Sequence, residues 1–311
     1  KLLVVNAWFG ISKIFTFKIL HEIWLHVIVL HTHKAEWIAQ YVDERIYTDD
    51  IHNSAKSCQS VSDYIRHWWI IDWVCTIWEE SVLLTSQITD MLWLPGIPYS
   101  ISSQIKNKYQ FRQKCIEYNI PSVLSHQIQS ESDLDRIVEH MYFPIMLKPC
   151  FGAASTHTVK IQNPQDFKDT YYYISKNNVE NTVHLKNWIA FYVEEFIEWP
   201  EIDVDILIQD AKILFWTITD NFTWSEPYFL PIGDVKPSSL PQDIQMEIYV
   251  LLEQTIQCFK LKNCCIHYEI KISSRWVIPL EINLRMGGAR IYDLVKYACN
   301  VDLVKYLAMI A

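Results

Sequence analysis

The sequence predicts an α/β protein with a doubly wound parallel sheet near its N-terminus and α+β structure in its C-terminal part. Two observations carry this prediction. A helical stretch at residues 11–24 lies between two short apolar runs, residues 2–5 and 26–30, and this β-α-β order favours a parallel sheet. Further along, apolar runs joined by short polar turns favour antiparallel hairpins. A length of 311 residues is typical of about two domains.

Composition and charge argue against several classes of protein. The net charge is −9 with histidine neutral, which disfavours a nucleic-acid partner because binding a phosphate backbone needs clustered Lys and Arg. No apolar run is long enough for a membrane span, and residues 2–5 are too few for a signal peptide. None of the eight cysteines forms a Cys-x-x-Cys pair, which is typical of reduced thiols. We therefore expect a cytoplasmic protein with no nucleic-acid or membrane partner.

The N-terminal part contains no dinucleotide-binding loop. The turn after its first predicted strand has one glycine, Gly10, where such a loop needs several. Residues 72–76 indicate another strand end, and residues 80–91 indicate a helix. The turn at residues 94–98, Leu-Pro-Gly-Ile-Pro, marks a boundary. We therefore predict an N-terminal α/β domain over residues 1–100.

The middle of the chain contains a predicted strand with a lysine near its end. Residues 143–149 form this strand and carry Lys148, and a loop of small residues, 152–156, follows. A strand, a loop of small residues and a second strand can fold over phosphate groups with backbone N–H donors. The other elements predicted between residues 106 and 309 are helices over 106–118, 164–175, 241–260 and 292–309, a strand over 189–193, and a half-exposed strand over 201–208 with a hairpin partner at 212–219.

Near the end, a predicted hairpin carries three polar side chains at alternate positions. Period two places Glu281, Asn283 and Arg285 on one face of their strand, and Glu269 lies on the preceding strand. A lone Glu is usually solvated, but the Glu-x-Asn-x-Arg spacing before Gly-Gly favours a site. Two carboxylates and an amide suit magnesium on a nucleotide phosphate. A guanidinium can hold developing negative charge.

Taken together, separated segments from about Lys108 to Gly288 resemble the ATP-grasp superfamily of carboxylate–amine ligases, and most closely its L-amino-acid ligase and carnosine synthase group. No single segment is specific, but their order and spacing match. The segments are Asn107–Arg112, Phe143–Pro149, Gly152–Ser155, Val193–Ile197, Glu201 and Glu281–Gly288.

The resemblance implies a cofactor set and a role for each matching residue. It implies ATP with Mg²⁺, or Mn²⁺ as the alternative metal. Its nucleotide-binding residues are Lys108, Lys148, Ser155, Glu194, Glu195, Phe196, Ile197 and Glu201, its metal ligands are Glu269, Glu281 and Asn283, and its catalytic residues are Arg285 and Lys148. Backbone N–H groups at Gly287 and Gly288 are expected to assist Arg285.

The resemblance also implies an activity and an architecture. The expected reaction joins a carboxylate, such as an amino acid, to an amine through an acyl phosphate and releases ADP and phosphate. The expected ATP-grasp fold has two α+β subdomains, a small lid over residues 101–188 and a large subdomain over residues 189–311. Members of the family usually continue beyond Ala311, so truncation of the large subdomain is one expectation, and a homodimer is another.

Departures from the family pattern leave alternatives open. Ala154 and His157 replace lid glycines, and Pro231 and Asp234 stand where a Glu and a His usually hold the amino-acid substrate. One alternative is a ligase for another acid and another nucleophile, such as bicarbonate, an amino sugar or a polyamine. The other is a catalytically impaired nucleotide-binding protein with a regulatory or assembly role.

Overall fold

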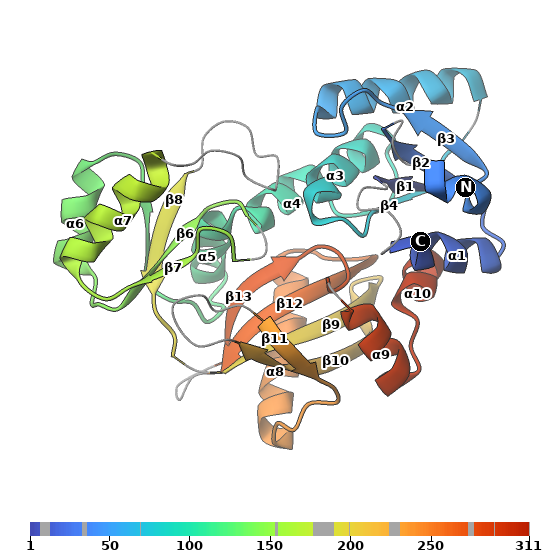
Figure 1. The fold of residues 1–311 in the computed structure, drawn as a ribbon. Coiled ribbons are helices and arrows are strands. Elements are labelled where there is room, and N and C mark those ends of the chain that lie inside the picture. Colours follow the sequence, from blue (N-terminus) through green and yellow to red (C-terminus); the bar gives the residue numbers. More distant parts are fainter. Residues whose placement is uncertain are drawn as a thin grey trace.

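The part of the chain that the structure describes consists of three β-sheets and the helices packed on them (Figure 1). The computed structural model describes residues 1–6, 13–32, 36–68, 70–152, 155–176, 190–198, 200–223, 231–272, 277–288 and 290–310. None of the helices in these ranges is long and apolar enough to cross a membrane.

The first sheet is parallel, as the sequence predicts. Its strand order is β3-β2-β1-β4, and each neighbouring pair runs parallel. The strands are β1 (Leu2–Val5), β2 (Val27–His31), β3 (Glu44–Tyr47) and β4 (Trp73–Cys75), with helices α1 (Ile14–Glu22), α2 (Ser54–Trp68) and α3 (Val82–Met91) and the 3-10 turns η2 (Glu36–Tyr41) and η3 (Glu79–Ser81). All residues of β1 and β2 are buried, which explains their continuous apolar sequences.

The second sheet is antiparallel, with strand order β5-β8-β6-β7. It consists of β5 (Ser125–Ile128), β6 (Ile145–Pro149), β7 (Val159–Ile161) and β8 (Phe191–Glu195), and helices α6 (Ser132–His140) and α7 (Pro164–Lys176) accompany it. Apolar side chains of α6 and α7 share one core with this sheet. The division of the chain at residues 100 and 188 stays a prediction. Strand β8 lies after residue 188, but it pairs with β5 and β6, which lie before it.

The third sheet is also antiparallel, with strand order β11-β10-β9-β12-β13. Its strands are β9 (Glu201–Gln209), β10 (Lys212–Thr223), β11 (Pro231–Val235), β12 (Cys264–Ile272) and β13 (Val277–Asn283), and α8 (Gln242–Cys258) packs against it. The pairing of β9 with β10 and of β12 with β13 confirms both predicted hairpins.

The two faces of this third sheet have different environments. On β9 the apolar Ile202, Val204 and Ile206 share a core with helices on one side of the sheet, so by the period of two Asp203 and Asp205 point to the other side. The prediction of a half-exposed strand here is wrong, because both aspartates are also buried. Asp205 pairs with Lys236 and His267, and Asp203 pairs with His267.

The predicted helix over 106–118 corresponds to α5 (Lys108–Glu117). It begins after Asn107, which leaves the helical conformation and accepts a hydrogen bond on its side chain from the Gln110 N–H. Helix α4 (Tyr99–Lys106), directly before it, was not predicted. The stretch 292–309 is split into α9 (Ile291–Cys299) and α10 (Leu303–Met309). Asn300 is left-handed at this break, with φ of 54°, and the Asp302 side chain caps α10.

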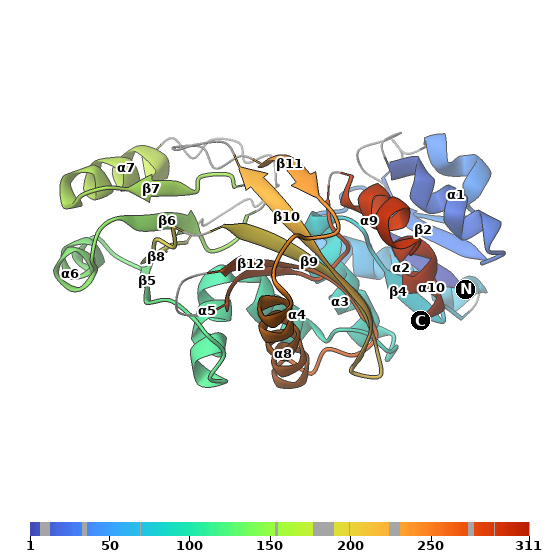
Figure 2. The same ribbon diagram turned by 90° about the horizontal axis from the view of Figure 1, so that it is seen from below.

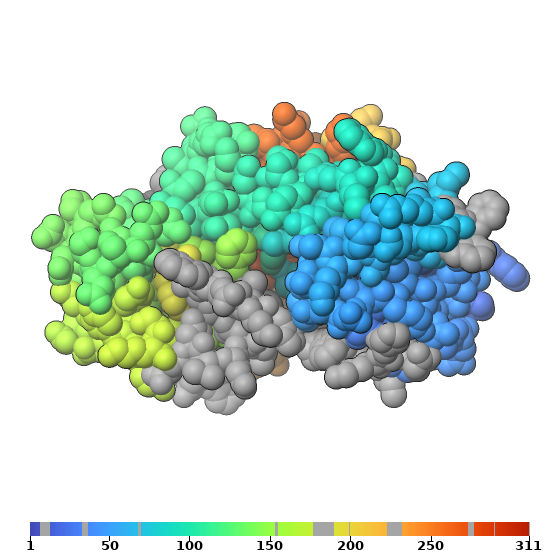
Figure 3. All heavy atoms as spheres, turned by 90° about the horizontal axis from the view of Figure 1, so that it is seen from above, coloured from blue at the N-terminus to red at the C-terminus, as the bar shows by residue number. Residues whose placement is uncertain are grey.

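The last two helices return to the first sheet. Side chains of α9 and α10 share one apolar core with β1, β2 and α1, and Figure 2 shows α10 beside α1. In the space-filling view from above, the teal residues of α4 and α5 run between the blue N-terminal part and the green part around α6 (Figure 3). The candidate active-site cleft lies between the second and third sheets.

Candidate active-site cleft

One cleft of about 420 Å³ brings together all the residues predicted to bind the nucleotide, to hold the metal or to act in catalysis through their side chains. Its volume falls within the usual range for small-molecule sites. The twelve candidates that line it are Lys108, Lys148, Ser155, Glu194, Glu195, Phe196, Ile197, Glu201, Glu269, Glu281, Asn283 and Arg285. They come from both antiparallel sheets and from the start of α5.

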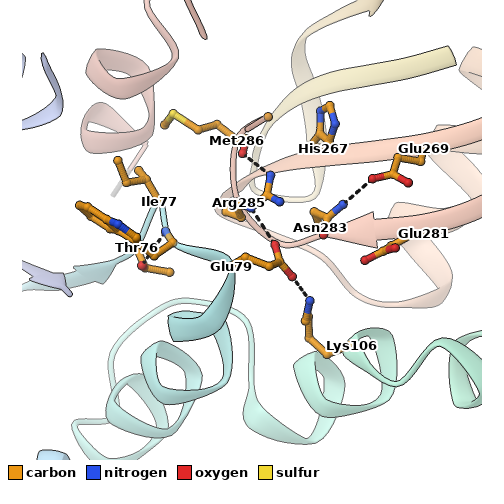
Figure 4. A network of polar contacts seen from close by, with 12 residues as sticks. Thr76, Ile77, Glu79, Lys106, His267, Glu269, Glu281, Asn283, Arg285 and Met286 are labelled. Carbon is orange, nitrogen blue, oxygen red and sulfur yellow. Dashed lines mark hydrogen bonds and ion pairs between the residues drawn. The ribbon is translucent and has the colours of Figure 1, made fainter. Parts of the chain in front are cut away.

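Two carboxylates face each other at the centre of this cleft. Glu269 on β12 pairs in register with Glu281 on β13, and the Asn283 side-chain amide donates to Glu269 Oε1 at 3.0 Å (Figure 4). Burial, followed by the charges of Glu281 and Glu201, raises the pKa of Glu269 to about 8. Burial would also raise the pKa of Glu281, but Lys108, Lys106 and Lys148 together outweigh burial, so the pKa of Glu281 is lowered.

The donor set fits a magnesium ion. Two half-buried carboxylates side by side repel each other, and a divalent cation would offset that repulsion. No group of three or more His, Cys, Asp and Glu side chains in the described ranges could hold a metal by itself. Magnesium is commonly bound through one or two carboxylates plus substrate phosphates, so Glu269, Glu281 and Asn283 suit an ion that arrives with a nucleotide.

Lys148 is held in the cleft by a buried carboxylate. Its ammonium lies 2.6 Å from Glu194 Oε1, and the Arg112 Nε donates to Glu194 Oε2 at 2.7 Å. Arg112 and Glu194 are almost inaccessible to solvent. Burial would raise the pKa of Glu194, but Arg112 and Lys148 together lower it to about 2. The Glu194 carboxylate therefore stays charged and fixes the position of Lys148.

Lys108 reaches the same cleft from the other side. It is the first residue of α5, directly after the capping Asn107. Its ammonium contacts Glu281 and also donates to the Gly152 carbonyl at 3.3 Å. Lys108 therefore links the carboxylate pair to the loop that follows β6.

Arg285 enters the cleft beyond the end of its strand, because β13 ends at Asn283. Its Nη1 donates to the Met286 carbonyl at 2.7 Å, and its Nε lies 2.7 Å from Glu79 Oε2 (Figure 4). Glu79 is not among the site residues predicted from the sequence. The available signal was its place just after a buried strand of the parallel sheet, where binding residues often gather.

A cluster of buried charged side chains lies near Arg285, and it was not predicted from the sequence. His267 sits between two aspartates, with Nδ1 3.0 Å from Asp205 and Nε2 3.4 Å from Asp203. Burial would lower the pKa of His267, but the two aspartates raise it to about 10. Asp205 also accepts from Lys236 at 3.3 Å and from the Gly287 N–H at 3.3 Å. The Gly287 N–H is therefore engaged with Asp205 rather than directed at a substrate, contrary to expectation.

The opposite end of the cleft carries the residues expected at a nucleoside. Lys271 donates to the Ile197 carbonyl at 3.2 Å, and its ammonium also lies 4.0 Å from Glu201 and 6.0 Å from the centre of the Phe196 ring. Burial raises the pKa of Glu201, although Lys271 opposes this. Glu195 is exposed at the end of β8. Lys271 thus ties the segment after β8 to the third sheet.

The loop after β6 adopts backbone conformations that favour glycine. Ser155 and His157 both have left-handed φ values, 53° and 57°. Ala154 lies outside the described residues. Asp234 lines the cleft opposite Asn221 on the neighbouring strand, and the side chain of Pro231 is outside the described part.

Known proteins resemble this chain in sequence and fold. Residues 141–293 match the ATP-grasp domain. The chain is 22% identical over 327 residues to carnosine synthase 1 of Homo sapiens, covering 100% of this chain and 39% of that protein. It is 24% identical over 236 residues to the L-arginine-specific L-amino acid ligase of Bacillus subtilis, covering 75% of this chain and 55% of the ligase.

The similarity in fold extends over nearly the whole chain. The crystal structure of an L-amino acid ligase from Bacillus licheniformis superposes with a TM-score of 0.82 at 16% identity, covering 98% of this chain and 72% of that one. The chain spans less than two thirds of the length of the curated relatives it matches.

Proposed function

This chain carries an ATP-grasp domain over residues 141–293, and from this premise we propose that it acts as an ATP-dependent ligase that joins a carboxylate to an amine. One observation supports the proposal above the others. Two lysines from distant segments, Lys108 and Lys148, meet Glu269, Glu281 and Asn283 in one cleft. Cations and oxygen donors in this arrangement suit the phosphate tail of one nucleotide.

The proposed reaction has two steps. A carboxylate oxygen of the acid substrate attacks the γ-phosphorus of ATP, the bond to the β–γ bridging oxygen breaks, and ADP leaves an acyl phosphate behind. The amine then attacks the acyl carbon and loses a proton, and phosphate departs as the amide forms. The name of the L-arginine-specific L-amino acid ligase favours an amino acid as one substrate.

The residues of the cleft divide this work. Lys108 and Lys148 offset the negative charge of the phosphates. The guanidinium of Arg285 stabilises the oxyanion that develops when the amine attacks. A magnesium ion, with manganese as the alternative, would be held by Glu269, Glu281 and Asn283, where it supplies charge neutralisation at the phosphates.

The direct test is an ADP-release screen. The protein is incubated with ATP and magnesium and with pairs of carboxylic acids and amines, and ADP and the amide product are measured. We expect ADP release that depends on the acid, and an amide whose identity names both substrates. A product formed from bicarbonate, an amino sugar or a polyamine would assign a different acid or nucleophile to the same chemistry.

The second candidate is a nucleotide-binding protein with impaired catalysis. The left-handed Ser155 and His157, where glycine is the residue that fits without strain, favour it. The intact set of lysines and carboxylates opposes it. Nucleotide binding without ADP release for any acid would support this candidate and count against the ligase.

A further inference from the structure

The carboxylate of Glu79, on η3 directly after the first sheet, forms an ion pair with the candidate catalytic residue Arg285. Glu79 Oε2 lies 2.7 Å from the Nε of Arg285, and the other oxygen of Glu79 contacts the Lys106 ammonium (Figure 4). The three side chains are 11%, 13% and 9% exposed, respectively. They belong to η3, to the segment after β13 and to α4. One carboxylate thus joins three distant parts of the chain at the wall of the cleft.

The segment that carries Glu79 is itself held in place. Thr76 Oγ1 donates to the Val5 carbonyl at 2.9 Å and accepts from the Trp78 N–H at 3.1 Å. Lys13 donates to the Ile77 carbonyl at 2.9 Å. A carboxylate on a braced segment can fix the position of its partner, because its own position is already determined.

The contacts of Arg285 leave one edge of its guanidinium for the cleft. Nε faces Glu79 and Nη1 donates to the Met286 carbonyl. Because the guanidinium is planar, contacts at these two nitrogens fix its plane. Arg285 lines the cleft that contains Lys148 and Glu281. Without Glu79, Arg285 would keep, among the residues that the structure describes, only the hydrogen bond to the carbonyl of its sequence neighbour Met286.

We propose that Glu79 is a positioning residue, through which the first sheet holds the guanidinium of Arg285 at the reacting end of the cleft. This inference rests on the proposed ligase function for its catalytic meaning. It makes the N-terminal part of the chain a contributor to the active site. A purely structural role for Glu79 would instead affect folding and nucleotide binding together.

Kinetics of three single variants separate these roles. For Glu79→Ala we expect kcat for acid-dependent ADP release to fall about 100-fold, since a misplacement of about 1 Å can cost that much. KM for ATP should change less than about 3-fold, because the lost interaction acts in the transition state. Glu79→Gln keeps an oxygen near Arg285 and should be intermediate. If Glu79→Ala fails to fold, Glu79→Gln provides the measurement.

Glu22→Gln is the matched control, because it removes the same charge at an exposed position of α1 in the same part of the chain. Its variant should stay within about 2-fold of wild type. In an Arg285→Ala background, Glu79→Ala should add almost no further loss, because it acts through Arg285. Equal losses in both backgrounds would overturn the proposal.

Crystal structures of wild type and Glu79→Ala give a readout that is independent of turnover. We expect the Arg285 guanidinium to leave its position in the variant. If it stays in place, Glu79 does not position it and the proposal is wrong, even if activity falls. If wild type releases no ADP with any acid but the guanidinium moves in Glu79→Ala, the ligase function fails while the positioning role stands.

Discussion

The Lys148 ammonium and the Glu194 carboxylate lie 2.6 Å apart, and Arg112 supports the carboxylate from its other side. For Lys148→Ala we expect kcat for ATP-dependent turnover to fall about 100- to 1,000-fold, as for the loss of one preorganised donor to developing charge. Lys168→Ala, which removes an exposed lysine paired with Asp135, is the control and should be unaffected. Full turnover by Lys148→Ala would contradict the assignment.

Acid stability should report on Glu194. Its pKa is lowered from the ordinary 4.5 to about 2, so its charged form stabilises the fold above pH 4.5 and this contribution is lost as the pH falls towards 2. The shift corresponds to about 3 kcal/mol. The difference in free energy of unfolding between wild type and Glu194→Gln should therefore shrink over this pH range.

Urea unfolding at several pH values measures this difference. Glu117→Gln removes an exposed carboxylate that pairs with Lys114 and should show no comparable trend, because surface pairs contribute about 0–1 kcal/mol. A constant difference between wild type and Glu194→Gln from pH 4.5 to 2 would contradict the buried ion pair.

Magnesium dependence should change when the carboxylate pair is altered. In Glu281→Gln the pair keeps its shape but loses one negative charge next to Glu269. We expect the magnesium concentration for half-maximal ADP release to rise at least about 10-fold. Glu253→Gln, on the exposed side of α8, is the control. An unchanged magnesium requirement in Glu281→Gln would remove it from the metal site.

The two adjacent glycines should differ sharply in their tolerance of a side chain. A Cβ at Gly287 would lie 2.6 Å from Ile291 Cγ2 and 3.0 Å from Asp205 Oδ1, whereas a Cβ at Gly288 meets nothing within 4 Å. Gly287→Ala should lower the free energy of unfolding by about 1–3 kcal/mol, the usual cost of overpacking. Thermal unfolding of both alanine variants tests this, and equal stabilities would contradict it.

The sequence predicts much of the fold because its strongest patterns are local. The apolar β1 and β2, the hairpin of β12 and β13, and the alternating charges of β9 are visible in short windows. The ATP-grasp resemblance depends on the order and spacing of segments between Lys108 and Gly288, and it is confirmed. Helix α4 was not predicted, because three of its eight residues are serines, which favour caps and turns over helix interiors.

The contacts between distant segments could not be predicted in the same way. Asp203 and Asp205 look like solvated positions in the sequence, since their buried partner His267 lies more than 60 residues away. Glu79 meets Arg285 across 206 positions of the chain, and no local pattern encodes that pairing. Burial of charge is decided by such tertiary partners.

The shared apolar core of α9, α10 and the first sheet has a consequence for protein engineering. A fragment that ends after α3 would expose the surface that Tyr292, Val295 and Leu307 cover, and it would tend to aggregate. A chimera that exchanges the parallel sheet with that of a relative should therefore also exchange α9 and α10.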